Sequence, residues 1–476
     1  MGVRQRGRLR AHSAAFSDLR FVRGRTFLVY LFVMRKFGLL FISLSVILIL
    51  MPGSLRADVK EYALDNGLKV LIMEDHKVPL ATFQVWYRVG SRNEPSGKSG
   101  LSHLLEHMMF KGTPRYGSKE FSKIIQRNGG MDNAYTTNDH TTYFQTMASD
   151  RIGLSIDLES DRMTNLIMDP KETVAERAVV MEERRLRTED DPQSALFENA
   201  IATAIKEHPY RRPVIGWMSD LASIERDDLY AYYKKFYAPH NAFVVIVGDV
   251  NPDEIMKKIT ASFGQIKVSE TQKSHISREP QQNGEKRVSL KKEAELPYIL
   301  AGYHVPSVPH EDSYALDVLS TVLSGGKSSR IYKSLVYEKK LALNAGADYS
   351  GTHLDPFLFF LWGTPAPGKD VAELEKMLYA EIEAIKSSPP SEQEVQKAKN
   401  QIEASFVFGQ DSLYMQAMKI GKFELLGGWK LKDTYLDGIR KVTPEDVRRV
   451  AKKYFSEENR TVGILIPQKA RSNSEK

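Results

Sequence analysis

The segment 101–109 carries apolar residues at i, i+3, i+4, i+7 and i+8, with polar residues between them. This spacing is typical of an α-helix that buries one face, so the pattern predicts a helix here. The polar positions of the segment include three titratable residues, and these lie off the buried stripe. The predicted stripe consists of Leu101, Leu104, Leu105, Met108 and Met109.

His103, Glu106 and His107 occupy polar positions of this predicted helix. Residues i and i+4 stack on one helix face, so both imidazole rings can reach a single tetrahedral cation. Glu106 points beside such a cation and could take a proton from a water molecule whose pKa zinc lowers to about 7. The alternative is a pair of solvated histidines on an amphipathic helix, but His-x-x-Glu-His is a pattern with a defined zinc chemistry.

A catalytic zinc site needs a third protein ligand, commonly a carboxylate, and leaves its fourth position to water. Residues 176–187 are rich in helix formers, and Glu176, Val180 and Glu183 fall on one face of the helix that they predict. Glu183 could bind the metal while Glu176 supports the site from one or two turns away. Spacing alone leaves Glu176, Glu182 and Glu183 open, and such acidic residues are often only a solvated helix face.

The inverted His-x-x-Glu-His, followed by two glutamates seven residues apart, resembles the inverzincin peptidases of the pitrilysin, insulinase and mitochondrial processing peptidase family. The resemblance covers roughly residues 59–467. It implies that Glu183 is the zinc ligand and Glu176 the supporting catalytic carboxylate, with Glu182 as the alternative ligand if the register slips by one. It also implies one Zn²⁺ per chain and a zinc endopeptidase in which Glu106 is the general base.

The segment 129–143 resembles the family's strand beside the zinc, whose free edge pairs with an extended peptide. Pairing of this kind binds the main chain of a peptide and therefore tolerates many sequences. The resemblance implies that Asn133 contacts the substrate backbone and that Ala134 belongs to the same substrate-binding edge. Without the resemblance, the Gly-Gly and Asn residues of this segment would indicate an ordinary hairpin.

The chain repeats part of its own sequence at an offset of 218 residues. Residues 224–247 parallel residues 442–465, and Asp228 matches Asp446 in this alignment. Each copy predicts a helix, a short turn and a buried strand, so the fold class is α+β with a duplicated unit. We therefore expect two homologous α/β-sandwich-like halves, each with a mixed sheet packed with helices. The resemblance adds a clam-shell architecture around a chamber for short or unfolded peptides.

A polar, weakly hydrophobic run separates the two copies and is typical of a linker. At the offset of 218, Thr321, Ser324 and Gly325 replace the His-x-x-Glu-His residues, so only the first half can bind zinc. The predicted organisation is a leader at 1–57, a zinc-binding domain at 58–267, a linker at 268–287, a homologous domain without zinc at 288–470 and a tail at 471–476.

One departure from the family concerns an arginine and a tyrosine that orient the substrate and stabilise the tetrahedral intermediate. Val336 and Leu343 stand at the two aligned positions, and neither donates a hydrogen bond. The neighbouring Tyr337 is followed seven residues later by Asn344, again not the right partner. Donors of this kind are typically worth about 3 to 4 kcal/mol. We therefore expect a homologous zinc-less subunit to supply them in a heterodimer, in preference to a homodimer.

The net charge of +7 is concentrated at the N-terminus. Residues 1–57 hold ten Arg or Lys against Asp18 alone, which leaves 57 basic and 59 acidic residues in the remainder. Without residues 1–57 the chain has a net charge near −2. A chain with this net charge lacks the basic surface expected of a nucleic-acid-binding protein. The absence of cysteine excludes disulfides and any thiolate zinc site.

The N-terminus is typical of a targeting signal. Arg35 and Lys36 precede an apolar run at 37–51, and Pro-Gly-Ser-Leu-Arg-Ala follows at 52–57. This order indicates a secretory signal peptide with cleavage after Ala57 and a true start at Met34. The expected localisation is therefore a bacterial periplasm or the outside of the cell. If the leader is not cleaved, it is the only part expected to contact a membrane, and the run is short for a span.

Two alternatives concern localisation and function. The Arg-rich residues 1–33 have some character of a mitochondrial presequence, which would place a presequence-processing β subunit in the mitochondrial matrix. A non-catalytic structural or binding subunit of the same fold is the other alternative. The intact His-x-x-Glu-His and the matching Glu183 favour the peptidase, because a structural subunit does not need a metal-activating base.

Overall fold

The computed structural model describes residues 58–268 and 276–469. The predicted leader, with its start at Met34 and its cleavage after Ala57, lies outside the described residues, and so does the predicted tail from residue 471 onward. Within the described ranges, no helix is both long enough and apolar enough to cross a membrane.

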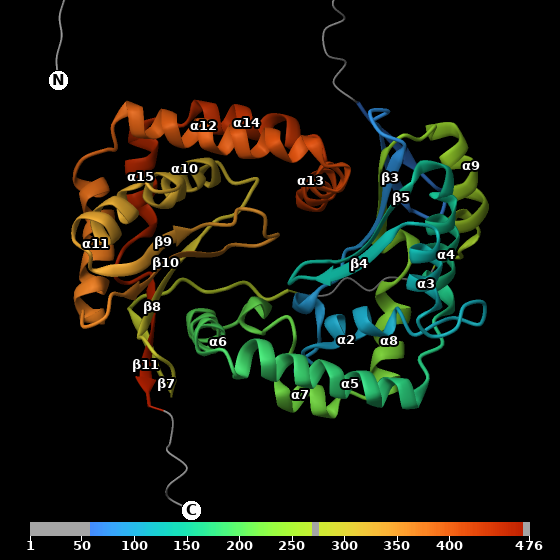
Figure 1. Cartoon of the computed structure of the whole chain (residues 1–476), viewed down its shortest axis with the longest axis horizontal. Helices are drawn as coiled ribbons and strands as arrows, with labels where there is room; N and C mark the ends of the chain where they lie inside the picture. The colour runs from blue at the N-terminus through green and yellow to red at the C-terminus, as the bar shows by residue number, and fades with distance from the viewer. Residues whose placement is uncertain (1–57, 269–275, 470–476) are drawn as a thin grey trace, which may run out of the picture. The chain divides into compact units, whose positions relative to one another are not determined.

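The first half of the chain builds a six-stranded sheet in the order β1-β2-β6-β3-β5-β4. Figure 1 labels β3, β4 and β5 of this sheet. Strands β2 and β6 are parallel and the other pairs are antiparallel. Every residue of β6 is buried, so apolar side chains on both of its faces need a covering layer. The strands are β1 (Val59–Ala63), β2 (Lys69–Glu74), β3 (Leu80–Tyr87), β4 (Met131–Thr136), β5 (Thr141–Ala148) and β6 (Ala242–Gly248).

Eight helices belong to the same half among the described residues. Helices α2, α4 and α8 contribute to the core on one face of the sheet, where Phe83 and Val85 meet Leu104 and Leu229. The helices are α2 (Leu101–Met108), α3 (Glu120–Arg127), α4 (Gly153–Asn165), α5 (Pro170–Arg184), α6 (Pro192–Ala204), α7 (Met218–Ser223), α8 (Arg226–Phe236) and α9 (Pro252–Ser262), with a π-helical turn η3 (Arg185–Glu189) extending α5.

The second half builds a five-stranded sheet in the order β7-β11-β8-β10-β9. Its strands are β7 (Lys286–Glu293), β8 (Tyr298–Val305), β9 (Ala342–Asp348), β10 (Phe357–Pro365) and β11 (Arg460–Gln468). Its helices are α10 (Asp312–Ser324), α11 (Val371–Ser387), α12 (Glu392–Phe408), α13 (Leu413–Leu426), α14 (Leu431–Lys441) and α15 (Pro444–Tyr454), with the π-helical segment η7 (Tyr332–Glu338) before β9.

The two sheets are copies of one topology once β1 is set aside. β2, β6, β3, β5 and β4 occupy the same successive positions as β7, β11, β8, β10 and β9, and the parallel pair β2–β6 corresponds to the parallel pair β7–β11. β3 and β8 begin 218 residues apart, as do β6 and β11. The predicted fold class, two homologous halves of mixed sheet and helices, is confirmed.

The two halves exchange one helix each, which the sequence pattern did not predict. Helix α6, from the first half, packs against β7, β8 and β11 of the second sheet. Helix α13, from the second half, packs against β3 and β6 of the first sheet. Gly421 of α13 lies so close to Trp86 that a Cβ atom there would be 2.3 Å from the indole ring. Each sheet is therefore covered by helices from both halves of the chain.

The described part of the predicted linker is held by main-chain and side-chain contacts. The Glu279 carboxylate accepts hydrogen bonds from the main-chain N–H groups of residues 206–208. Gln282 donates to the main-chain oxygen of Arg460, and β7 begins at Lys286. The domain boundaries drawn from the sequence remain predictions.

Candidate active site

Helix α2 carries the His-x-x-Glu-His residues and is fixed at both its buried face and its N-terminus. Each of the five residues of the predicted apolar stripe is at most 2% exposed, so that prediction is confirmed. The helix begins after Gly100, whose φ of 94° is left-handed, and a Cβ atom there would lie 2.7 Å from the main-chain oxygen of Ile215. This close approach favours glycine at the start of the helix.

Glu94 binds the N-terminus of α2, a role that the sequence did not reveal. Its carboxylate accepts hydrogen bonds from the N–H groups of Gly100 at 2.9 Å and Ser102 at 2.7 Å. These groups have no acceptor within the helix, and the helix dipole favours a carboxylate at this end. Burial nevertheless raises the pKa of Glu94 to about 7, against the lowering effect of these hydrogen bonds.

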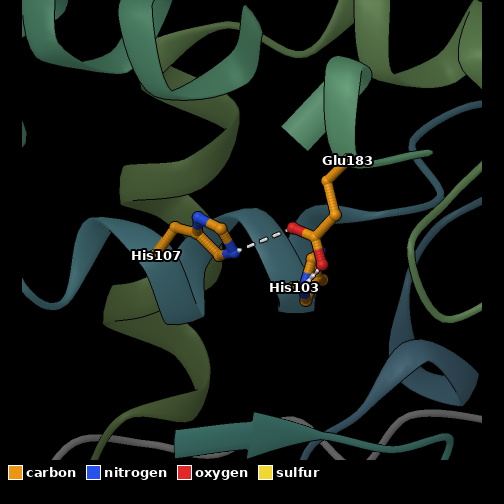
Figure 2. Close-up of side chains that lie close together, drawn as sticks. All are labelled: His103, His107 and Glu183. Carbon is orange, nitrogen blue, oxygen red and sulfur yellow. Dashed lines mark ion pairs between the residues drawn. The ribbon is translucent and has the colours of Figure 1, made fainter. Parts of the chain in front are cut away.

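His103, His107 and Glu183 come together where α2 packs against α5 (Figure 2). The Nε2 atom of His103 lies 3.9 Å from one carboxylate oxygen of Glu183, and the Nε2 atom of His107 lies 3.5 Å from the other. One donor atom from each residue lies within 4.8 Å of the other two. Donors about 2.0 to 2.2 Å from a tetrahedral zinc ion are about 3.4 Å apart, so the three groups need to close by only a small distance to share one ion.

The protonation state of His103 suits a cation. Burial, reinforced by the neighbouring His107, lowers the pKa of His103 to about 3, so this imidazole is neutral with a lone pair to offer. The Nδ1 atom of His103 is buried without a hydrogen-bond partner. Across residues 58–268 and 276–469, this trio is the one group of three or more His, Asp or Glu side chains close enough to hold a metal ion.

Glu176 orients the second imidazole. Its Oε1 atom lies 2.9 Å from Nδ1 of His107, so His107 donates from Nδ1 and turns the lone pair of Nε2 toward Glu183. Glu176 also forms an ion pair with Lys111. The hydrogen bond from His107, which outweighs burial, and the charge of Lys111 lower the pKa of Glu176 to about 2. Although burial opposes it, the hydrogen bond to Glu176 raises the pKa of His107.

The side chain of Glu106, on α2, is 9% exposed and lies toward the end of β4. Burial raises the pKa of this carboxyl group, which suits a base that must hold a proton for part of a reaction. Thr136 Oγ1, at the end of β4, donates a hydrogen bond of 2.5 Å to Glu106 Oε2. In the part of the chain that the structure describes, the other oxygen, Oε1, has no hydrogen-bond partner.

The structure distinguishes the three glutamates that the sequence left open. Glu182 points away from the histidines, its side chain is 57% exposed, and it pairs with Arg185 at 2.7 Å. Glu183 faces both rings, and Glu176 reaches only the outer nitrogen of His107. Arg187, which the sequence reasoning missed, forms an ion pair of 2.7 Å with Glu183. Its i, i+4 spacing from Glu183 was the available signal.

Among residues 58–268 and 276–469, β4 is the last strand of its sheet, and no described strand pairs with its outer edge. Asn133 is exposed on this strand, and its Oδ1 atom accepts a hydrogen bond of 2.8 Å from the N–H of Ala134. Ala134 is half-buried against the core. The strand that ends at Thr136, beside Glu106, thus presents main-chain groups that a further strand could pair with.

The second half has no comparable constellation at the matching positions. Thr321 and Ser324 lie on α10 and Gly325 follows it. Val336 is half-buried against the second core, and Leu343 on β9 is 51% exposed. The side chains at both positions remain unable to donate a hydrogen bond. Tyr337 is 72% exposed.

Family models match both halves of the chain. The family described as "Insulinase (Peptidase family M16)" matches residues 69–217, and "Peptidase M16 inactive domain" matches residues 223–402. Zinc protease PqqE of Helicobacter pylori is 32% identical over 433 residues, covering 89% of this chain and 97% of that protein. Uncharacterized zinc protease YmxG of Bacillus subtilis is 27% identical over 401 residues, covering 84% of this chain and 96% of that protein.

Solved structures share the fold over most of the chain. The crystal structure of a protease from Helicobacter pylori superimposes with a TM-score of 0.83 at 32% identity, covering 86% of this chain and 100% of that chain. The crystal structure of the periplasmic protease PqqL from Escherichia coli superimposes with a TM-score of 0.72 at 18% identity, covering 89% of this chain but 50% of that chain.

Proposed function

Because this chain belongs to peptidase family M16, we propose that it is a zinc-dependent endopeptidase that hydrolyses short or unfolded peptides in an extended conformation. The observation that carries the proposal is the convergence of His103, His107 and Glu183 on one point, with the buried carboxyl group of Glu106 beside them. Zinc held by these three side chains would lower the pKa of water to about 7 and polarise the peptide carbonyl.

Side chains of the protein would perform the other steps of the reaction. Glu106 would take a proton from water at Oε1 and later give it to the departing amine, while Thr136 holds Oε2. Glu176 would keep His107 in the tautomer that exposes Nε2, and Lys111 would keep Glu176 ionised. The roles of these residues follow from their contacts and are part of the proposal.

The free edge of β4 supports the extended-peptide part of the proposal. A substrate added as a further strand would pair with the main chain near Asn133 and Ala134 and would then pass Thr136. The Asn133 side chain would have to release the N–H of Ala134 to let this pairing form. Strand addition requires an unfolded segment, so we expect folded proteins to be poor substrates.

Hydrolysis of an internally quenched peptide by the zinc-loaded chain tests the proposal. We expect Glu106→Gln to reduce kcat by at least about 10²-fold without loss of bound zinc, since it removes the proton acceptor alone. Glu182→Gln is the matched control, because Glu182 is exposed and points away from the site. Zinc-loaded protein that cleaves no peptide, alone or with a partner, would favour the structural or binding subunit instead.

The absence of donors at Val336 and Leu343 supports a partner subunit. The proposal is that a homologous zinc-less chain supplies an arginine and a tyrosine to this site, as in the heterodimeric members of the family. Co-purification with mass spectrometry would identify such a chain, and adding it should raise kcat by about 10²-fold or more. Full activity of the isolated chain would contradict the partner requirement.

Export is a further part of the proposal and depends on the N-terminal sequence pattern alone. The basic pair at residues 35 and 36 and the apolar run at 37–51 support a cleaved signal peptide. N-terminal sequencing of the mature protein should give Asp58 as the first residue. An N-terminus upstream of the apolar run, or protein found in a mitochondrial matrix, would contradict export.

A further inference from the structure

A cavity of about 640 Å³ adjoins the candidate metal centre and plays no part in the mechanism above. Arg187 connects the two, because it lines the cavity and lies 2.7 Å from the candidate ligand Glu183. The other walls come from α6, from the segment 210–215 and from the start of β10, so both halves of the chain contribute. A residue of a peptide lying at the metal centre would be within reach of this space.

The charge of the lining is positive. Arg187, Arg211 and Arg212 face the cavity. In the part of the chain that the structure describes, Arg187 has an ion pair with Glu183 alone, and neither Arg211 nor Arg212 lies in an ion pair. Arg211 donates to the main-chain oxygen of Lys206.

Arg212 donates to the main-chain oxygen of Glu94. Each guanidinium group carries five N–H donors, so Arg187, Arg211 and Arg212 all keep N–H groups that a ligand can use. The nearby carboxyl group of Glu94 is only partly ionised near neutral pH, because burial raises its pKa to about 7.

The acidic residue in the lining is already neutralised. Both carboxylate oxygens of Glu198 accept hydrogen bonds of 2.8 Å from the buried Arg184. A bidentate pair of this kind is among the strongest side-chain interactions and leaves little charge to face the cavity. A metal ion bound by Glu183 would offset the negative charge of this carboxylate. Arg187 would then have no partner with a full negative charge.

The remaining walls are apolar. Phe197 is 42% exposed although it lies within the cavity, and Ile201 and Phe357 stand beside it. Exposed aromatic surface in a concave site is typical of a binding pocket. The lining therefore combines an apolar wall with a cluster of guanidinium groups, which suits a ligand with an apolar body and a carboxylate.

We infer that this cavity is a specificity pocket for a carboxylate of the peptide substrate close to the bond that is cleaved. The carboxylate belongs to an aspartate or glutamate side chain or to the C-terminus of the peptide, and Arg187 and Arg211 bind it. The inference rests on the proposed endopeptidase function and names the class of peptide that the site prefers. Guanidinium groups bind carboxylates with paired, directed hydrogen bonds, which a neutral amide cannot replace.

Matched peptides test the inference on the zinc-loaded chain, together with its partner subunit if one is required. One series places Glu, Gln or Lys at each of the three positions on either side of the cleaved bond, and a second compares a free C-terminal carboxylate with a C-terminal amide. We expect kcat/KM to favour the carboxylate by about tenfold, equivalent to about 1.4 kcal/mol, at one or two positions. The two series show whether the side chain or the C-terminus is the source.

Variants assign the effect to the cavity. Arg187→Gln and Arg211→Gln should each remove most of the preference for carboxylate peptides, and Arg211→Glu should shift the preference toward Lys. Arg185→Gln is the matched control, because Arg185 pairs with the exposed Glu182 and does not line the cavity. Zinc content, measured alongside, separates loss of the preference from loss of the metal. A preference that is absent, or that survives both cavity variants, would overturn the inference.

Binding provides a second readout that does not require catalysis. Fluorescence anisotropy with the Glu106→Gln chain should give a Kd about tenfold lower for the carboxylate peptide than for its amide counterpart, and Arg211→Gln should abolish this difference. If the wild-type chain cleaves nothing, either alone or with its partner subunit, the proposed function fails, and this assay still decides the pocket by itself. Equal Kd values for the two peptides would contradict carboxylate recognition.

Discussion

Thr136 Oγ1 lies 2.5 Å from Glu106 Oε2 and joins the candidate base on α2 to the edge strand β4. The contact connects the strand that would pair with substrate to the carboxylate that would accept a proton. In the proposed mechanism Thr136 would act through Glu106, as a positioning residue. A substrate strand paired along β4 would restrict Thr136 and thereby hold Glu106 in one orientation.

We predict that Thr136→Val lowers kcat by about tenfold to 10²-fold with little change in KM, because it leaves the base without its hydrogen bond. Thr136→Ser should restore most of kcat, since it returns the hydroxyl group. Steady-state kinetics with a quenched peptide measures both values. Equal losses in the Val and Ser variants would contradict the role of the hydrogen bond, because serine keeps the hydroxyl group.

Removal of the Glu176 carboxylate should weaken metal binding. Glu176→Gln loses the charge that accepts from Nδ1 of His107 and pairs with Lys111, and such outer contacts are typically worth about 10- to 100-fold in metal affinity. Competition with a zinc chelator measures this change. Glu182→Gln, on the same helix but exposed, should bind zinc as the wild type does. An unchanged zinc affinity of Glu176→Gln would show that Glu176 does not support metal binding.

The raised pKa of Glu94 predicts a dependence of stability on pH. Its pKa rises from the ordinary 4.5 to about 7, so the folded chain keeps this proton at pH values where the unfolded chain has lost it. The contribution to stability is therefore fully present below about pH 4.5 and is lost as the pH rises toward and through about 7, by up to about 3 kcal/mol.

Urea unfolding at pH 5, 6, 7 and 8 tests the contribution of Glu94. Glu94→Gln should flatten this part of the pH dependence, because the amide in place of this carboxyl group does not titrate. Parallel pH profiles for the variant and the wild type would contradict the assignment.

The contact between Gly421 and Trp86 predicts that the exchanged helix α13 tolerates no side chain at this point. Gly421→Ala would place a methyl group 2.3 Å from the indole ring, and we expect a loss of about 1 to 3 kcal/mol from overpacking. Thermal unfolding measures the loss. Gly264→Ala, where the nearest atom to the added Cβ lies 3.6 Å away, is the control and should change stability little.

Local sequence determined the elements that carry the chemistry. The period of the apolar residues fixed α2 and its buried stripe, and the i, i+4 spacing put His103 and His107 on one face. The offset of 218 residues predicted a duplicated unit, and the two sheets share one strand order. These features depend on neighbours within a few turns or on comparison of the chain with itself, so they can be inferred without any knowledge of packing.

Only the tertiary structure decided the contacts between distant segments. The packing of α2 against α5 brings Glu183 and not Glu182 to the histidines, and the pairing of β4 with β5 places Thr136 beside Glu106. The uniformly apolar β6 shows that both faces of the sheet must be covered, but any sufficiently apolar helix satisfies that requirement. Burial is non-directional, so the sequence pattern does not specify that α13 and α6 cross to the opposite halves.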